Sequence, residues 1–394
     1  MAFVQKKWIY LNLILIIMIS FLVFYTSFLF QVWQPINQHR VSDVPEHSQF
    51  ILNFIQKGHF PVYSLWYILV ALFSGYSTHL TNITFVSIVL LSMLIGIKYL
   101  ISFLILKVDC LGARKIAFFS FVLIFVMPIL SFYIPSEYPN TVMISSFHVY
   151  LGNIAANQWH NSTLILAMPL NLVLFYYSIH YINSERLYRF LIMAIFAVLS
   201  ILCKPNYALV FIPLLCLILF ILNIRKRDYL MAFIKPLIIA VPAVLTLFYQ
   251  WYFTFLDNDL FQHPTKTIIA PFLVWQHYSP HICTSLILSI AFPLVVLIFN
   301  FKKIDRYLLL SWLTFLVATA IFSLFAEYPD FASGNFGWGC IAATYILFLF
   351  SIKLLLNQPL DWKAKIAYLI LMLHFLSGCF LLVSFFVSET SLLL

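Results

Sequence analysis

Apolar segments long enough to cross a lipid bilayer recur along the whole of this 394-residue chain, and no other feature restricts its fold as strongly. A transmembrane helix needs about 20 apolar residues, because the hydrocarbon core of a bilayer is about 30 Å thick. Hydrophobic residues make up 63% of the chain and charged residues 9%, whereas about a quarter of the residues of a soluble domain are charged. We therefore predict an all-α, polytopic integral membrane protein.

About eleven transmembrane helices are predicted from the lengths of these segments. The ordinary spans are expected at 8–30, 82–106, 116–134, 162–182, 231–255, 281–300, 307–326, 338–355 and 366–388. The longer run 188–224 is interrupted by CKPNY, in which Pro205 removes a helix hydrogen bond and Lys204 is costly in lipid. We interpret this run as two short helices, 188–203 and 206–224, that meet at a turn.

The distribution of Lys and Arg predicts the orientation of the spans. Cytoplasmic loops of membrane proteins are enriched in these residues. If the N-terminus is cytoplasmic, only four of the 22 basic residues fall on the opposite side: Arg40, Lys57, Lys204 and Lys266. The net charge of +9 then belongs to one membrane face, so nucleic acid is not an expected partner. A multi-pass protein of the plasma or inner membrane is expected.

Two short helices are predicted on the outer membrane surface, between the first and second spans. Residues 46–57 place apolar side chains on one face and polar side chains on the other. Residues 61–74 are apolar but too few to cross the bilayer, and counting them as a span would export the basic loops that follow. Both helices are therefore interpreted as interfacial, and the polar stretch VSDVPEH that precedes them faces outward.

The order of these parts resembles the GT-C superfamily of polytopic membrane glycosyltransferases. Members share a first span, an outward loop that opens with an acidic residue, two interfacial helices and a second span. Here the acidic residue is Asp43 in SDVPEH, followed three places later by Glu46, whereas many members have adjacent Asp and Glu. The turn LCKPNY is similar to the TKP or TKG turn of the superfamily, with Cys203 in place of Thr. The resemblance covers residues 1–225, and 226–394 would complete a single membrane domain with additional transmembrane helices.

The resemblance implies an inverting glycosyltransferase that acts at the extracytoplasmic face. Such an enzyme moves a sugar from a polyprenyl-phosphate carrier to an acceptor, which is a glycan, a lipid or a protein. Its partners would be the lipid-linked sugar, that acceptor and the surrounding membrane lipids. The resemblance implies no definite cofactor. A divalent metal is left open, although no HExxH or comparable spacing indicates a dedicated metal site.

Two carboxylates and two cations are the candidates for chemistry. Asp43 is either the N-cap of the following helix or the general base that takes the proton of the acceptor hydroxyl. Glu46 is the second candidate for the base, or a metal ligand. Lys204 is either a lysine that extends toward the lipid headgroups or a pocket cation that stabilises the phosphate leaving group, and Arg40 is a second candidate for phosphate binding.

Several outward residues suit a sugar, because aromatic faces stack on sugar rings while amides and imidazoles bond hydroxyls. His47 is a candidate substrate contact or metal ligand. Trp159 and its two neighbours either anchor the chain at the membrane interface or bind sugar. The full set of candidate substrate-binding residues is His47, Trp159, His160, Asn161, Glu327, Asp330, Asn335 and Trp338.

Three other functions remain open on sequence grounds. A transporter or flippase of a lipid-linked or small polar substrate would show broken helices in corresponding halves, and only the Lys204–Pro205 break is evident. An O-antigen-type polymerase or ligase would hold key arginines in a large outer loop, and the outer loops contain only Arg40. A purely structural membrane subunit would not need an outer face rich in acids and histidines.

Overall fold

The computed structural model describes residues 2–33, 42–60, 64–107, 112–133, 143–144, 149–255 and 266–387. The chain forms two compact units, each built from two separate stretches of sequence. Unit 1 contains Met1–Ile105 and Trp159–Lys266, and unit 2 contains Leu106–Gln158 and Thr267–Leu394. Residue 225, up to which the resemblance extends, lies within unit 1.

Nine helices in the described residues are long and apolar enough to cross a membrane, which confirms an all-α polytopic protein. The other two predicted spans are shorter helices in the structure. The first of the hairpin pair has 17 residues, about 26 Å at the rise of an α-helix. The helix expected over 116–134 has only 13 residues.

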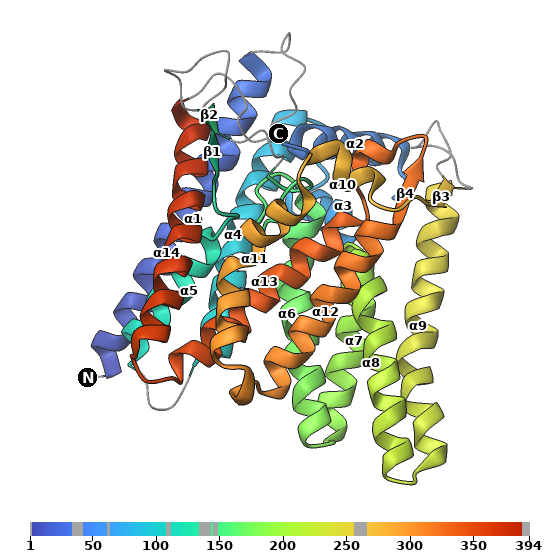
Figure 1. Ribbon diagram of the computed structural model, residues 1–394. Helices are drawn as coiled ribbons and strands as arrows, with labels where there is room; N and C mark the ends of the chain where they lie inside the picture. Colours follow the sequence, from blue (N-terminus) through green and yellow to red (C-terminus); the bar gives the residue numbers. More distant parts are fainter. Residues whose placement is uncertain are drawn as a thin grey trace. The chain divides into compact units, whose positions relative to one another are not determined.

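The described residues of unit 1 form helices and the connections between them, and the unit ends at Lys266, the first residue of a strand. Its helices are α1 (Ala2–Trp33), α2 (Val44–Lys57), α3 (Leu65–Phe73), α4 (Leu80–Leu106), α6 (Ser162–Asn183), α7 (Leu187–Cys203), α8 (Asn206–Arg225) and α9 (Tyr229–Phe255). Helices α6 to α9 pack side by side (Figure 1). Helices α1 and α4 approach closely at Gly96, where a Cβ atom would lie 2.9 Å from Ile17 Cγ1.

The predicted break in 188–224 is confirmed. Helix α7 ends at Cys203, Lys204 is extended, and α8 begins at Asn206. At the far ends of the hairpin, Glu185 forms ion pairs with Lys226 and Lys235. These ion pairs join the α6–α7 connection to the α8–α9 pair, so α7 and α8 run in opposite directions and Lys204 lies at the end remote from Glu185.

The two helices predicted at 46–57 and 61–74 are α2 and α3. Helix α3 has 9 residues, about 14 Å, and cannot cross a bilayer by itself. Residues 61–63 lie outside the described part, so the start predicted at Pro61 is untested. The observed α3 begins where Ser64 accepts a hydrogen bond from the backbone N–H of Trp66.

Unit 2 surrounds one long buried helix. Its elements are α5 (Ala113–Phe125), α10 (Leu273–Tyr278), α11 (Ile282–Phe299), η1 (Phe301–Lys303), α12 (Arg306–Leu324), η2 (Phe331–Ser333), α13 (Gly337–Leu356) and α14 (Trp362–Val387), with strands β1 (Phe132–Tyr133), β2 (Met143–Ile144), β3 (Lys266–Ile269) and β4 (Phe325–Tyr328). β1 pairs antiparallel with β2, and β3 pairs with β4. Helix α13 is almost fully buried and contacts α5, α11 and α12. Small residues at its start, Gly337 among them, allow this close packing.

The span predicted over 116–134 is wrong in extent, because α5 ends at Phe125. Pro128 has no N–H and disfavours a helical conformation in the residue before it, so a helix cannot readily continue through this apolar run. The chain from Val126 onward is extended, although it lies among apolar side chains. Extended backbone in such surroundings must find hydrogen-bond partners inside the protein.

Side chains and backbone groups of unit 2 provide those partners. Asn157 Nδ2 donates to the carbonyl oxygens of Leu123 and Val126, each at 2.9 Å. The Met127 N–H donates to the His374 carbonyl at 3.1 Å, and the His374 ring Nδ1 lies 2.7 Å from the Met127 carbonyl. The other ring nitrogen of His374 accepts from the Phe292 N–H at 3.3 Å, close to a kink in α11. His374 and Asn157 are thus structural side chains that stabilise interrupted helices.

The contact between α14 and the end of α5 generates a first prediction. A Cβ atom on Gly378 would lie 1.6 Å from the Phe125 carbonyl oxygen, so Gly378→Ala must displace backbone. We expect it to destabilise the full-length protein by about 3 kcal/mol, the upper part of the range for overpacking. Thermal unfolding in detergent, followed by intrinsic fluorescence, measures the change.

The matched control is Gly112→Ala, because a Cβ atom at Gly112 has no described atom within 4 Å. Gly112 is the N-cap residue of α5, where Ala is a weaker cap than Gly, so this variant should lower the unfolding temperature only slightly. Equal unfolding temperatures for both variants would show that α14 does not approach Phe125 as described.

Candidate functional site

Asp43 precedes the first turn of α2, but its carboxylate does not cap that helix. Its backbone conformation is helical (φ −77°, ψ −5°), and its side chain makes no capping hydrogen bond. The first turn is instead supported by Pro45 and by Ser42 Oγ, which accepts from the Val44 N–H at 3.2 Å. Asp43 therefore holds the N-cap position of α2 through its backbone, while its carboxylate makes no capping bond there and is available for other contacts.

The side-chain amide of Asn161 binds this carboxylate from a position 118 residues further along the chain. Asn161 Nδ2 donates to Asp43 Oδ2 at 3.2 Å. Asn161 Oδ1 caps α6, accepting from the Leu164 N–H at 3.0 Å and from Thr163 Oγ1 at 2.9 Å. Asn161 is 7% exposed. Its orientation is therefore set by the start of α6.

Lys204 binds the same amide. Its Nζ donates to Asn161 Oδ1 at 3.0 Å and to Thr163 Oγ1 at 3.3 Å. The break between α7 and α8 presents the lysine here, and Ser64 Oγ donates to the neighbouring Cys203 carbonyl at 3.4 Å. The start of α3 is thereby joined to the break.

Three segments of unit 1 thus meet in what we call the Asp43–Lys204 site: Asp43, His160, Asn161, Thr163 and Lys204. A backbone hydrogen bond completes it, from the Asp43 N–H to the His160 carbonyl at 3.3 Å. The site offers a partly exposed carboxylate and a partly exposed ammonium, oriented by one buried amide.

His47 adjoins this site and is neutral at physiological pH. Its ring Nδ1 lies 2.9 Å from the Tyr67 hydroxyl of α3. Burial lowers the pKa of His47 from 6.5 to about 4, and Lys204 lowers it further while Asp43 acts in the opposite direction. Burial also lowers the pKa of His160. Both imidazoles can therefore accept or donate hydrogen bonds without carrying charge.

The other candidates in unit 1 have varied positions. Glu46 is exposed in the first turn of α2, three residues after Asp43. Trp159 is 3% exposed and its ring packs against Phe24 at 6.2 Å between centroids. This placement is that of a packing residue. Arg40 lies outside the described residues.

Unit 2 brings most of its own candidates together. Glu327 Oε2 accepts from Asn335 Nδ2 at 2.6 Å, and Asn335 Oδ1 accepts from Trp338 Nε1 at 3.3 Å. Ser333 Oγ also donates to Glu327, at 3.2 Å. Asp330 is exposed beside this chain of hydrogen bonds. The set forms a small polar surface around the β4–α13 connection.

Among the described residues, no group of three or more His, Cys, Asp and Glu side chains is arranged to hold a metal ion. The chain matches no protein-family model and no curated protein.

Sequence reasoning missed one residue of the Asp43–Lys204 site and one residue beside it. Thr163 binds both Asn161 and Lys204, and Tyr67 binds His47. The polar run at 161–163 before an apolar helix is a recognisable N-cap signal, so the fixed orientation of Asn161 was open to prediction. No local pattern indicates the pairing with Asp43.

The lowered pKa of His47 generates a prediction about pH. In the unfolded chain this histidine takes up a proton as the pH falls through 6.5, whereas in the folded protein it does so only near 4. The unfolded state then binds more protons, so folded stability is lost between these values, by up to about 3 kcal/mol. His47→Gln should reduce the fall in unfolding temperature between neutral pH and about pH 4.5.

The control is His79→Gln, since His79 is an exposed histidine of the same unit. It should leave the pH dependence of the unfolding temperature unchanged. If His47→Gln follows the same pH dependence as the unmodified protein, the ring is not buried in its neutral form.

Proposed function

We propose that this chain is a membrane glycosyltransferase of the GT-C type, which moves a sugar from a polyprenyl-phosphate carrier to a glycan, lipid or protein acceptor. The proposal rests on one observation above all: Asn161 holds Asp43 and Lys204 in a single site of unit 1. A carboxylate and an ammonium in one place are the two charged groups that this reaction needs.

In the proposed reaction Asp43 takes the proton of the acceptor hydroxyl. The acceptor oxygen forms a bond to the anomeric carbon from the face opposite the carrier, and the bond between that carbon and the phosphate oxygen breaks. The phosphate leaves with the electron pair, and the Lys204 ammonium stabilises the negative charge that develops on it. The configuration at the anomeric carbon is inverted.

The neighbouring groups suit the same reaction. His47 and His160 are neutral, so neither competes with Lys204 for the phosphate nor neutralises Asp43. The basic residues of the α6–α7 and α8–α9 connections lie at the opposite end of the hairpin from Lys204. By the positive-inside rule that end is cytoplasmic, which would place the site at the extracytoplasmic face of the plasma or inner membrane.

A transporter is the second candidate, and unit 2 contains the observation that favours it. Helix α5 is interrupted at Val126 and α11 is kinked at Ile290, and discontinuous helices often form substrate sites in transporters. However, several backbone groups at these breaks are bound by Asn157 and His374, which leaves them less available to a substrate. The glycosyltransferase is therefore the stronger proposal.

The Asp43→Asn variant tests the proposal. The full-length protein in proteoliposomes is given a panel of polyprenyl-phosphate sugars, labelled in the sugar, with membrane lipids and glycans as acceptors. We expect transfer by the unmodified protein and a loss of at least about 100-fold in Asp43→Asn, because the general base is removed. The initial rate of label transfer is measured.

Glu46→Gln is the matched control, since Glu46 is an exposed carboxylate three residues away. It should retain the rate within a few fold. Sugar transfer at the full rate by Asp43→Asn would show that Asp43 is not the general base. Failure to use any donor, together with uptake of labelled solute into sealed vesicles that Lys204→Ala abolishes, would support the transporter.

A further inference from the structure

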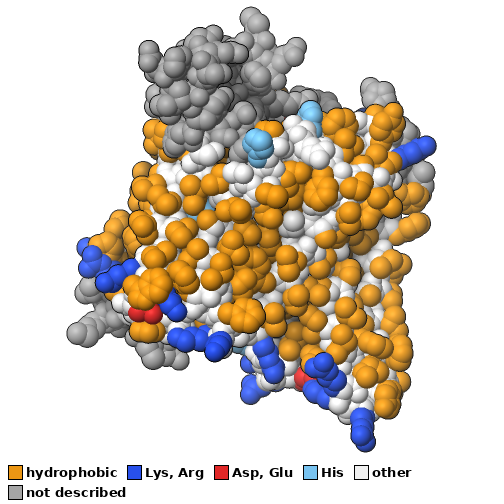
Figure 2. All heavy atoms as spheres, viewed as in Figure 1, with side chains coloured by type: hydrophobic (Ala, Val, Ile, Leu, Met, Phe, Trp, Pro, Cys, Tyr) orange, Lys and Arg blue, Asp and Glu red, His pale blue; other side chains and the backbone are white. Residues whose placement is uncertain are grey.

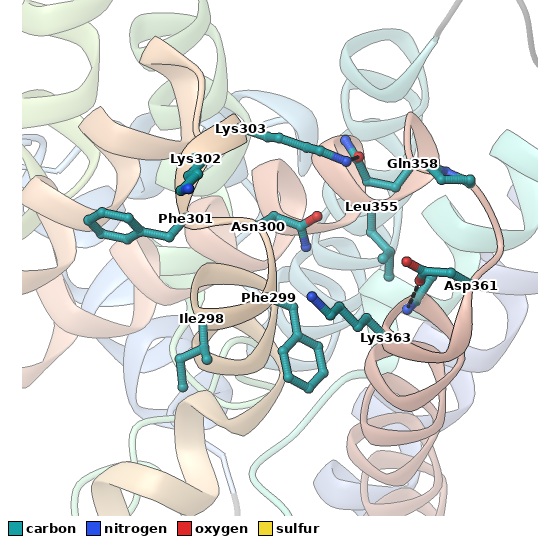
Figure 3. Close-up of a pocket in the computed structure, with 12 residues that line it drawn as sticks. Ile298, Phe299, Asn300, Phe301, Lys302, Lys303, Leu355, Gln358, Asp361 and Lys363 are labelled. Atoms are coloured by element: carbon teal, nitrogen blue, oxygen red, sulfur yellow. Dashed lines mark hydrogen bonds between the residues drawn. The ribbon is translucent and has the colours of Figure 1, made fainter.

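A cavity of about 460 Å³ lies in unit 2, where the connection between α11 and α12 meets the connection between α13 and α14 (Figure 3). This volume is within the usual range for small-ligand sites. The two connections are joined by Lys303, whose Nζ donates to Gln358 Oε1 at 2.7 Å. The cavity belongs to neither of the polar sites described above.

The charge around this cavity is mainly positive. Lys302, Lys303 and Lys363 line it, together with one carboxylate, Asp361. That carboxylate caps α14, accepting from the Ala364 N–H at 2.8 Å (Figure 3). In Figure 3, Lys303 extends toward Gln358 and Lys363 extends toward Asn300, so ammonium groups from both connections reach the hollow. Their arrangement suits a phosphate.

The remaining wall is apolar and aromatic. Ile298, Phe299 and Leu355 line the cavity, and Phe301 at its edge is 72% exposed. The exposed Trp362 ring lies 5.6 Å from the Phe299 ring and below the Lys363 ammonium. Exposed aromatic rings at a helix end are typical of the membrane interface. A ligand here would therefore have a charged part and an apolar part.

The cavity also lies at the basic end of unit 2. The Phe119 ring is 5.3 Å from that of Tyr368 and the Phe125 ring is 6.4 Å from that of Phe375, so α5 and α14 run in the same direction. The first turn of α5 carries Arg114 and Lys115, and that of α14 carries Lys363 and Lys365; these four residues gather at the end that holds the cavity. Figure 2 shows Lys and Arg side chains gathered at helix ends, with hydrophobic side chains covering the lengths between.

We propose that this cavity binds the phosphate headgroup of an anionic membrane lipid, from the leaflet at the basic end. Basic pockets between membrane helices recognise such headgroups, and each lysine near an anionic surface contributes measurably to attraction. A free phosphate ion would satisfy the lysines but leave the apolar wall and the exposed rings unused. A lipid would contact both the lysines and the apolar wall, because its phosphate binds the lysines while its glycerol and acyl chains continue along α11 and α14 into the hydrocarbon.

Quenching of Trp362 fluorescence by brominated lipid tests this proposal. The full-length protein is reconstituted with brominated phosphatidylglycerol or brominated phosphatidylcholine. The Trp362→Phe variant keeps the other eight of the nine tryptophans, so its signal is subtracted from that of the unmodified protein to give the quenching of Trp362 alone. We expect preferential quenching by phosphatidylglycerol. In the Lys302→Ala/Lys363→Ala variant the preference for phosphatidylglycerol should fall by about tenfold or more, because two lysines that attract the anionic headgroup are removed.

Lys365→Ala is the matched control, since Lys365 is an exposed lysine of the same helix that does not line the cavity. Its loss of preference should be clearly smaller than that of the double variant, because Lys365 does not line the cavity. The single Lys302→Gln and Lys363→Gln variants provide a second measurement with smaller structural change, and each should lose part of the preference. Equal quenching by both lipids in the unmodified protein would overturn the proposal. Displacement of phosphatidylglycerol by millimolar inorganic phosphate would also overturn it, because the ligand would then be a free phosphate.

Discussion

The amide of Asn161 is the interaction on which the candidate site depends. A side-chain amide donates and accepts hydrogen bonds at once, so Asn161 can bind the Asp43 carboxylate through Nδ2 and the Lys204 ammonium through Oδ1. Hydrogen bonds to charged groups contribute about 1.5–3 kcal/mol each, more than bonds between neutral groups. Because the same oxygen caps α6, the amide has one orientation. The two charges are therefore placed by the start of a helix rather than by flexible side chains alone.

Helix ends and breaks provide all the polar parts of this arrangement. Asp43 precedes α2, Asn161 precedes α6, and Lys204 separates α7 from α8. Backbone groups at such positions lack partners within their own helix and bind side chains instead. Between these ends the helices are mainly apolar, as expected for helices that cross a membrane. The cavity lined by Lys302, Lys303 and Lys363 in unit 2 also lies at helix ends, where two helix connections meet.

Short-range features could be predicted from the sequence, and long-range ones could not. Pro205 and Lys204 predict the α7–α8 break because both act on their own neighbours in the chain. The early end of α5 was missed, although Pro128 is visible, because the extended backbone beyond it is stable only with Asn157 and His374 as partners. The role of Asn161 depends on a contact across 118 residues, which no local pattern encodes. The interleaving of two units from four stretches of sequence is a tertiary property for the same reason.

The central claim is that Asp43 and Lys204 act as one site. A double-mutant cycle on the rate of sugar transfer, with Asp43→Asn, Lys204→Met and their combination, tests it most directly. Substitutions of residues that act as a unit have strongly non-additive effects on the rate. The double variant should therefore lose about as much rate as the more damaging single variant. Losses that simply multiply, as they do for distant and independent positions, would contradict a shared site.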